Sequence, residues 1–235
     1  MIELHQFPPA FGLANASPFA IKLQAYCQLA NIEYKNHYRV DSHKMPKGKL
    51  PVAIIDNELI ADSSLIINKL EATHELDKDL TPTEHAQGHL LQQLCEEQLY
   101  WSLVYSRWID DDFWPVSKEE FFGKLPAFLK LFVPNSMRKR AIKNCKSQGT
   151  GRHDKQEIYA IANKSIDHLS VLLTDKNFFI SEKMTRYDCA IYGLLTNFLN
   201  GGIQSPIKKR LESHKNLVAY IGETQAATML SRTPN

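Results

Sequence analysis

Residues 50–63 read Leu-Pro-Val-Ala-Ile-Ile-Asp-Asn-Glu-Leu-Ile-Ala-Asp-Ser, and this stretch decides the fold. Two short runs, 52–55 and 58–61, flank the polar pair Asp56-Asn57, which is the pattern of a β-hairpin with a two-residue turn. Asp62-Ser63 then begins an amphipathic helix, whose apolar residues are Leu65, Ile66, Ile67 and Leu70. The stretch therefore predicts a β-β-α unit.

The residues before this unit predict a β-α-β arrangement. Residues 2–7 and 32–40 alternate apolar and polar side chains, as half-buried strands do. Between them Ser17-Pro18 begins a helix, because serine is a good N-cap and proline suits the first helical position. A helix between the two strands implies that they are parallel, and the hairpin adds an antiparallel edge.

The rest of the chain predicts helices alone. Thr81-Pro82-Thr83-Glu84 is a capping box that begins a long helix reaching to about residue 109. Further helical patterns run over roughly 117–131, 134–146, 153–174, 186–199 and 206–230. We expect an α/β thioredoxin-like domain at residues 1–76, a linker at 77–83 and an all-helical domain at 84–235.

Composition and charge exclude several classes of function. The chain has 28 basic and 26 acidic residues, a balance that argues against nucleic acid as a partner. Its four cysteines lie far apart, so we expect reduced, mostly buried thiols. His85 and His89 lack the HExxH pattern, so we expect no metal site. No apolar run approaches the ~20 residues that span a bilayer, and residues 1–5 do not resemble a signal peptide, so we expect a cytoplasmic protein without a membrane anchor.

Three features of the first domain suit one ligand. Ser17 lies at a helix N-terminus, where free N–H groups and the helix dipole favour a thiolate. A cis bond at Leu50-Pro51 would turn the backbone groups of residue 50 outward, ready to pair with a peptide. Asp62 suits an α-ammonium group, and Ser63 with the helix N–H groups suits an α-carboxylate. Together the three features suit a ligand with a thiol in its middle and a zwitterionic end, and glutathione is such a ligand.

These residues resemble the glutathione site of serine-type glutathione transferases. The resemblance covers the whole chain: Glu96–Trp101, Tyr105–Trp108 and Gly149–His153 are similar to the branch that contains the failed axon connections protein and the metaxins. Thr185 and Asp188 resemble the capping box of the superfamily's buried helix. The resemblance implies that Ser17 activates the thiol and that Leu50-Pro51 belongs to the glutathione site, with Leu50 pairing through its backbone with the cysteinyl part. It also implies that Asp62 and Ser63 bind the γ-glutamyl end, and that the protein is a homodimer.

The residues alone leave simpler roles open. Ser17 and Asp62-Ser63 are also ordinary helix caps. Tyr105, Arg107 and Trp108 either line a pocket for an electrophile or belong to the core, and Arg107 is also a candidate ion-pair partner for Asp110–Asp112 or Glu97. Cys27 lies about ten residues beyond the helix start, which disfavours a dithiol oxidoreductase.

The resulting hypothesis is an enzyme. It transfers glutathione to a small apolar electrophile, or reduces that electrophile with glutathione, and Ser17 stabilises the thiolate. The alternative is a non-catalytic binding or adaptor module of the metaxin type, and a third hypothesis is a ligandin-like carrier that uses the aromatic pocket without chemistry.

Overall fold

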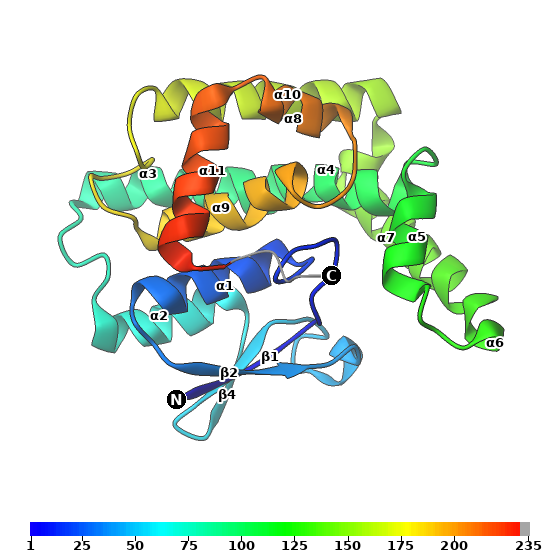
Figure 1. Cartoon of the computed structure of the whole chain (residues 1–235), viewed down its shortest axis with the longest axis horizontal. Coiled ribbons are helices and arrows are strands. Elements are labelled where there is room, and N and C mark those ends of the chain that lie inside the picture. Colours follow the sequence, from blue (N-terminus) through cyan, green and yellow to red (C-terminus); the bar gives the residue numbers. More distant parts are fainter. Residues whose placement is uncertain (231–235) are drawn as a thin grey trace.

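The computed structural model describes residues 1–230 of the chain and divides into a sheet-containing part and a helical part (Figure 1). The first part contains β1 (Ile2–Gln6), α1 (Pro18–Leu29), β2 (Tyr34–Tyr38), a short 3₁₀ turn η1 (Ser42–Lys44), β3 (Val52–Ile55), β4 (Glu58–Ala61) and α2 (Ser63–His74). The predicted β-α-β and β-β-α units are both present, in the predicted order.

The four strands form one mixed sheet in the order β2-β1-β3-β4. β1 and β2 are parallel, whereas β1 with β3 and β3 with β4 are antiparallel. Along β1 the side chains of Ile2 and Leu4 are buried and Glu3 is exposed, as the alternating pattern predicts. Helices α1 and α2 lie between the sheet and the helical part (Figure 1).

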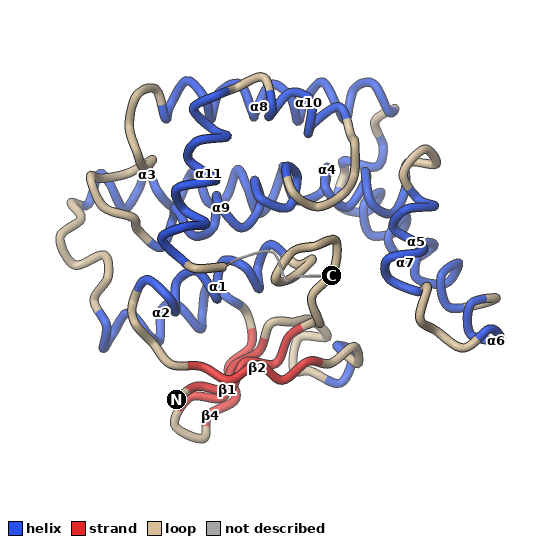
Figure 2. Tube along the Cα trace, viewed as in Figure 1, coloured by secondary structure: helices blue, strands red, loops and turns tan. Residues whose placement is uncertain are grey.

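The second part consists of helices joined by loops (Figure 2). A continuous helical run from Pro82 to Ile109 consists of α3 (Pro82–Gln93), π-helical η2 (Leu94–Leu99), α4 (Tyr100–Val104) and π-helical η3 (Tyr105–Ile109). There follow α5 (Trp114–Phe122), α6 (Ala127–Lys130), α7 (Val133–Gln148), the 3₁₀ turn η4 (Thr150–Arg152), α8 (Lys155–Leu173), α9 (Arg186–Leu199), α10 (Pro206–Glu212) and α11 (Lys215–Thr228).

Two predicted helices are each divided in the structure. The pattern over 117–131 is interrupted before Pro126, which cannot continue the hydrogen-bond ladder of α5, and the chain restarts as α6. The pattern over 206–230 breaks at Ser213 and His214. The Ser213 hydroxyl donates to the Arg210 carbonyl at 2.6 Å, and His214 has an extended backbone.

Helix α9 forms the centre of the molecule and packs along α1. Its N-terminus has the predicted capping box, in which Thr185 and Asp188 bind each other's backbone N–H groups. Close packing depends on Gly193, because a Cβ atom there would lie 2.5 Å from the carbonyl oxygen of Pro18. The start of α1, where Ser17 lies, is therefore pressed directly against the helical part.

The four cysteines are buried and unpaired, in agreement with the sequence prediction. Within residues 1–230, no helix combines the length and the apolar character that crossing a bilayer requires.

The segment between α2 and α3 is bound to the helical part by a buried ion pair. The carboxylate of Asp77 accepts from the backbone N–H of Arg186 at 3.1 Å and from its Nε at 2.5 Å. Arg186 also contacts Glu71 of α2 at 3.1 Å, so one guanidinium joins α2, the connecting segment and α9. Asp77 is 2% exposed, whereas the nearby Asp79 is exposed.

We expect Asp77→Ala to lower the free energy of unfolding by about 3 kcal/mol, because it leaves a half-buried arginine without its main partner. The matched control Asp79→Ala should change it by less than about 0.5 kcal/mol, since its 3.8 Å pair with Lys183 is exposed. Urea denaturation followed by circular dichroism measures both values. Equal losses in the two variants would contradict the assigned role of Asp77.

Candidate functional site

The strand register brings the predicted binding segments to one end of the sheet. Val52 pairs with Ala61, so the next residues along each strand, Pro51 and Asp62, adjoin. His5 of β1 pairs with Val52, so the chain that leaves β1 toward Ser17 passes beside Leu50. Ser17, Leu50-Pro51 and Asp62-Ser63 thus come from three separate segments to the same edge.

Asn15 connects the first of these segments to the second. Its side-chain oxygen accepts from the backbone N–H of Ser17 at 2.9 Å, and its side-chain nitrogen donates to the Phe7 carbonyl at 2.6 Å. Phe7 in turn packs against the small cluster of Leu50, Val52 and Ala61. Because Asn15 is fully buried, these bonds fix Ser17 relative to the sheet.

The hydroxyl of Ser17 is not used to cap its helix. In the described part of the chain, five helices have an N-cap side chain that accepts a backbone N–H: Asp62 for α2, Thr81 for α3, Asp154 for α8, Thr185 for α9 and Ser205 for α10. Ser17 has the extended backbone of an N-cap, but its side chain makes no such bond. Its hydroxyl has no partner among residues 1–230 and is free to donate to a ligand.

The Leu50-Pro51 peptide bond is cis. Leu50 is nearly buried through its side chain, but its N–H and C=O groups hydrogen-bond to no other residue in the described part of the chain. An extended peptide lying beside residue 50 would find both groups unoccupied.

Asp62 has an uncommon backbone conformation. Its φ of 92° and ψ of 125° lie in a region that non-glycine residues rarely occupy, and such strain is typical of ligand sites. One carboxylate oxygen accepts from the N–H groups of Ser64 at 2.9 Å and Leu65 at 3.4 Å. The side chain is exposed, while the neighbouring Ser63 is buried, and the second carboxylate oxygen has no hydrogen-bond partner among residues 1–230.

A buried polar cluster joins the start of α2 to α1 and α3. The Lys22 ammonium donates to the Ser64 hydroxyl and to Glu96, both at 2.7 Å, and Gln92 donates to the same two groups at 3.0 and 2.9 Å. Lys22 and Glu96 are mostly buried, and their charges balance. The cluster holds the N-termini of α1 and α2 in a fixed relation across the boundary between the two parts.

Arg107 does not form the ion pair with Asp110–Asp112 or Glu97 that the sequence left open. Its Nη1 donates to the Ala16 carbonyl at 2.7 Å, and its Nη2 donates to the side-chain oxygen of Asn197 at 2.9 Å. Its guanidinium also lies over the Phe11 ring at 4.7 Å. Asp110 instead binds Lys155 and Tyr159.

The charge of Arg107 is buried without a counter-ion. The residue is 3% exposed, its Nε has no partner, and it contacts no carboxylate among residues 1–230. Burial accordingly lowers the pKa of Arg107 below its ordinary value. The peptide unit between Ala16 and Ser17 is therefore held at both ends: Arg107 binds its carbonyl, and Asn15 binds its N–H.

The two other residues expected in an electrophile pocket lie on different sides of the helix. Tyr105 packs edge-on against Tyr159 of α8. Trp108 stacks on Phe121 of α5 at 5.0 Å, and Phe121 meets Phe11 edge-on at 5.0 Å. Trp108 is thus connected through rings to the loop that precedes Ser17, and Tyr105 is not part of that chain of contacts.

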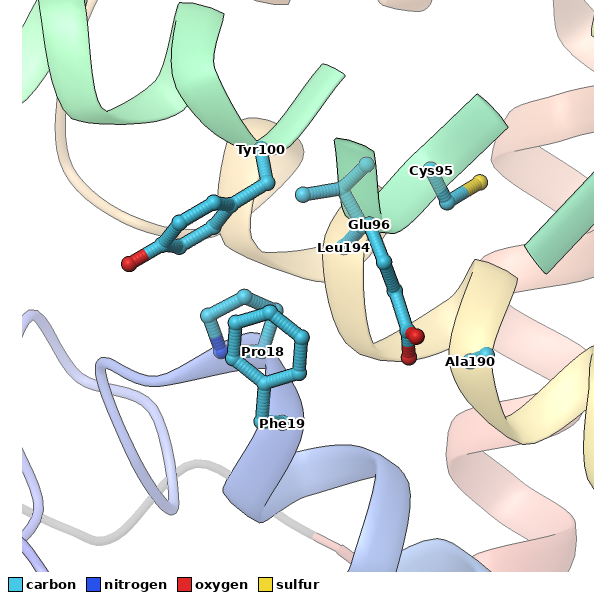
Figure 3. Close-up of a pocket in the computed structure, with 7 residues that line it drawn as sticks. All are labelled: Pro18, Phe19, Cys95, Glu96, Tyr100, Ala190 and Leu194. Carbon is cyan, nitrogen blue, oxygen red and sulfur yellow. The ribbon is translucent and has the colours of Figure 1, made fainter. Parts of the chain in front are cut away.

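A small cavity lies between the start of α1 and the helical part (Figure 3). Its volume of about 10 Å³ suits one water molecule, and its lining comprises Pro18, Phe19, Cys95, Glu96, Tyr100, Ala190 and Leu194. The rings of Phe19 and Tyr100 lie 5.0 Å apart, edge to face, on one side of it. The start of α1 therefore packs closely against the helical part but leaves one small gap beside Pro18 and Phe19.

Cys27 lies inside α1 and is fully buried. Burial raises the pKa of its thiol to about 12, so the group stays protonated and unreactive at neutral pH.

Sequence reasoning missed Asn15, Phe11 and Phe121. Asn15 carried a usable signal, because an asparagine two residues before a helix N-cap commonly binds the backbone at that position. Phe11 and Phe121 carried none, since their contact depends on how the loop after β1 lies against α5.

Comparison with protein-family models places the chain in a known superfamily. A model described as the glutathione S-transferase N-terminal domain matches residues 18–113, and a model of the glutathione S-transferase C-terminal domain matches residues 162–224. The chain belongs to the glutathione S-transferase superfamily.

Individual proteins of known name share at most 29% of their residues with this chain in the three comparisons that follow. The chain is 29% identical to the isoprene-epoxide–glutathione S-transferase of Rhodococcus sp. (strain AD45), over 94% of this chain and 96% of that protein. It is 26% identical to Failed axon connections of Drosophila melanogaster, of which it spans only 56%, and 25% identical to a Metaxin-1 homolog of Caenorhabditis briggsae, of which it spans 72%.

Solved structures share the fold. A beta-etherase from Sphingobium sp. strain SYK-6 has a TM-score of 0.63 at 14% identity, with 97% of both chains covered. The apo form of glutathione S-transferase III also has a TM-score of 0.63, at 12% identity, covering 100% of this chain and 98% of that one. These likenesses establish the two-domain fold expected from the sequence.

Because the Ser17 hydroxyl caps nothing, we expect Ser17→Ala to change the free energy of unfolding by less than about 0.5 kcal/mol. Ser205 offers a matched control, since it also precedes a proline at a helix start but does accept from the Lys208 N–H at 3.3 Å. Ser205→Ala should cost about 1 kcal/mol. Thermal unfolding of both variants tests this, and a larger loss at Ser17 than at Ser205 would contradict it.

Proposed function

We propose that this protein is a glutathione transferase that joins glutathione to a small apolar electrophile, with Ser17 stabilising the thiolate. The observation that carries the proposal is the free hydroxyl of Ser17. A serine whose only task was to cap α1 would bind a backbone N–H of the first turn, as Ser205 does for α10. Ser17 is instead held rigidly through its backbone while its hydroxyl has no partner in the described chain.

Glutathione would bind across the edge where the three segments meet. Its cysteinyl backbone would pair with the N–H and C=O of Leu50, next to Pro51. Its α-ammonium group would bind the free oxygen of Asp62, and its α-carboxylate would bind at Ser63, whose N–H lies at the positive end of α2. The exposure of Asp62 and its unusual φ support this assignment.

The thiolate would be stabilised by several groups at the start of α1. A thiol with an ordinary pKa of about 8.5 is mostly protonated at neutral pH, and a hydrogen bond from Ser17 to the charged form lowers that pKa. The N-terminus of α1 adds the positive end of its dipole. Arg107 adds a full positive charge one residue away, and a bound thiolate would supply the counter-charge that this guanidinium lacks.

The reaction itself is a nucleophilic substitution at carbon. The thiolate sulfur forms a bond to an electrophilic carbon, and the bond from that carbon to its leaving atom breaks, with the electron pair going to the leaving atom. An epoxide, the class named in the Rhodococcus relative, suits this step because its opened oxygen then takes a proton from solvent. The rings of Trp108, Phe121 and Phe11 are the apolar surface we assign to the electrophile, with Arg107 beside them.

The second candidate function is a non-catalytic adaptor module. It is favoured by the similarity to Failed axon connections and to a Metaxin-1 homolog. An adaptor could keep the glutathione site without shifting the thiol pKa, so the two candidates differ in one measurable property. The domain limits at 1–76, 77–83 and 84–235, the homodimer and the cytoplasmic location stay predictions of the sequence and the family resemblance.

We expect Ser17→Ala to raise the pKa of the bound glutathione thiol by about one unit or more, because the hydrogen bond to the thiolate is lost. The rate of conjugation at neutral pH should fall by at least about tenfold. Ser17→Thr, which keeps a hydroxyl, should largely restore both. The thiolate's ultraviolet absorbance measures the pKa, and 1-chloro-2,4-dinitrobenzene or an alkyl epoxide serves as the electrophile.

Two outcomes of that titration would reject parts of the proposal. Tight binding of glutathione with an ordinary thiol pKa in the natural protein would favour the adaptor. Failure to bind glutathione at all would reject the site.

Asp62→Asn tests the other end of the ligand. Asparagine has the same size and shape as aspartate and can still accept from the Ser64 N–H, so the substitution chiefly removes the charge. We expect the dissociation constant of glutathione to rise about 10- to 100-fold, the loss of one charge-assisted hydrogen bond. Asp56→Asn, also at a positive φ but in the β3–β4 turn, is the control and should leave binding unchanged. Calorimetric titration gives both constants, and equal effects would argue against a role for Asp62 in binding.

A further inference from the structure

Residues 123–148 form a projecting segment that the proposed glutathione site does not use. They comprise the turn after α5, the one-turn helix α6 and all of α7, and we call them the basic arm. Figure 1 shows α6 at the outer end of the molecule along its longest axis, away from the sheet and from α8 to α11. The fold thus places this segment where it can meet a large partner.

The tip of the basic arm exposes large apolar side chains. Phe128, Leu131 and Phe132 are 65%, 67% and 70% exposed. If a large side chain offers about 200 Å² to solvent, the three together expose on the order of 400 Å² within five residues of sequence. Patches of that size on a soluble protein commonly mark a place where another surface binds.

The same segment is strongly cationic. The basic arm has seven basic residues and no acidic one, whereas the rest of the chain has 21 basic and 26 acidic residues. Six of the seven are exposed and form no ion pair within residues 1–230: Lys124, Lys130, Lys139, Arg140, Lys143 and Lys146. Although the net charge of the whole chain is close to zero, its positive charge is concentrated in the basic arm, beside the apolar tip.

Helix α7 presents its charges in an ordered way. Lys139, Arg140, Lys143 and Lys146 recur at spacings of three and four and share the solvent face. The opposite face is fixed to the body: Pro134 and Cys145 are buried, and Arg138 donates to the carbonyls of Trp108 and Ile109 at 2.9 and 2.8 Å. The outer residues are thus free of any structural task.

We propose that the basic arm binds the surface of a bilayer that contains anionic lipid, with Phe128, Leu131 and Phe132 inserted among the headgroups. An exposed cationic helix face combined with exposed apolar side chains is the chemistry that such a surface recognises. A second copy of this chain fits less well, because a symmetric contact would place two cationic arms against each other. This binding is independent of the proposed transferase activity.

The test is co-flotation of the full chain with vesicles of phosphatidylcholine alone and with vesicles that also contain phosphatidylglycerol. We expect binding to the mixed vesicles, weakened by salt, and at least tenfold weaker binding to phosphatidylcholine alone. Binding that is equal on the two kinds of vesicle, or absent from both, would overturn the proposal.

Two variants with matched controls separate the two components of binding. The arm variant Lys139→Glu/Arg140→Glu/Lys143→Glu should reduce binding at least tenfold. The control variant should reduce binding far less; it makes the same change in net charge at other exposed lysines, Lys164→Glu/Lys176→Glu/Lys215→Glu. Phe128→Ser/Leu131→Ser/Phe132→Ser should also reduce it at least tenfold. Val171→Ser/Leu172→Ser removes exposed apolar residues from α8 and should not. Equal effects of arm and control variants would overturn the proposal.

Two further measurements address other occupants of the arm. Sedimentation that shows a dimer dissociated by the triple serine variant would assign the tip to a second copy of the chain. Binding of a single-stranded oligonucleotide that is tighter than vesicle binding and is lost in the triple glutamate variant would assign it to nucleic acid. Either result would overturn the membrane assignment. Circular dichroism of each variant, with the same helical signal as the natural protein, shows that the fold is kept.

Discussion

The arrangement of the candidate site depends on the peptide unit between Ala16 and Ser17. Two buried side chains from different parts of the molecule bind it: Arg107, from the helical part, binds its carbonyl, and Asn15, from the loop after β1, binds its N–H. Asn15 also binds the Phe7 carbonyl, so the position of Ser17 is fixed relative to the sheet as well as to the helical part. A serine so held needs no cap bond of its own, which explains how its hydroxyl stays free.

Two positive charges near the candidate site, both at the boundary between the two parts, have contrasting environments. Lys22 is neutralised by Glu96 within a closed cluster, so its task is to hold α1, α2 and the α3–η2 run together. Arg107 has only carbonyl and amide partners in the described chain, so its charge is unbalanced. Both π-helical segments contribute to this boundary, since η2 carries Glu96 and η3 carries Arg107. Such wide turns are frequent at functional sites.

Much of the fold could be predicted from local chemistry. The hairpin around Asp56-Asn57 and the caps at Thr81 and Thr185 follow from short-range preferences, and the structure has each of them. The breaks before Pro126 and at Ser213 were missed because helical periodicity continues across them. Pro126 does indicate the first break, but the apolar periodicity around it favoured one continuous helix. Nothing in the sequence around Ser213 marks a helix end strongly.

The candidate site was predicted only in part. The residues of its three segments could be proposed because each is a local pattern, and the strand register brings those segments to one end of the sheet. The partners of Arg107 could not be predicted, since Ala16 and Asn197 lie about 90 positions away in either direction along the chain. Sequence proximity suggested Asp110–Asp112 instead, but Lys155 and Tyr159 already bind Asp110. Long-range geometry, which no local pattern encodes, decided that assignment.

A crystal structure of the protein with glutathione tests the central claim most directly. The account predicts the glutathione sulfur within about 3.5 Å of the Ser17 hydroxyl, with the γ-glutamyl ammonium group at Asp62 and the Arg107 bond to the Ala16 carbonyl intact. A structure in which the tripeptide lies elsewhere, or in which the Ser17 hydroxyl turns back to cap α1, would contradict it.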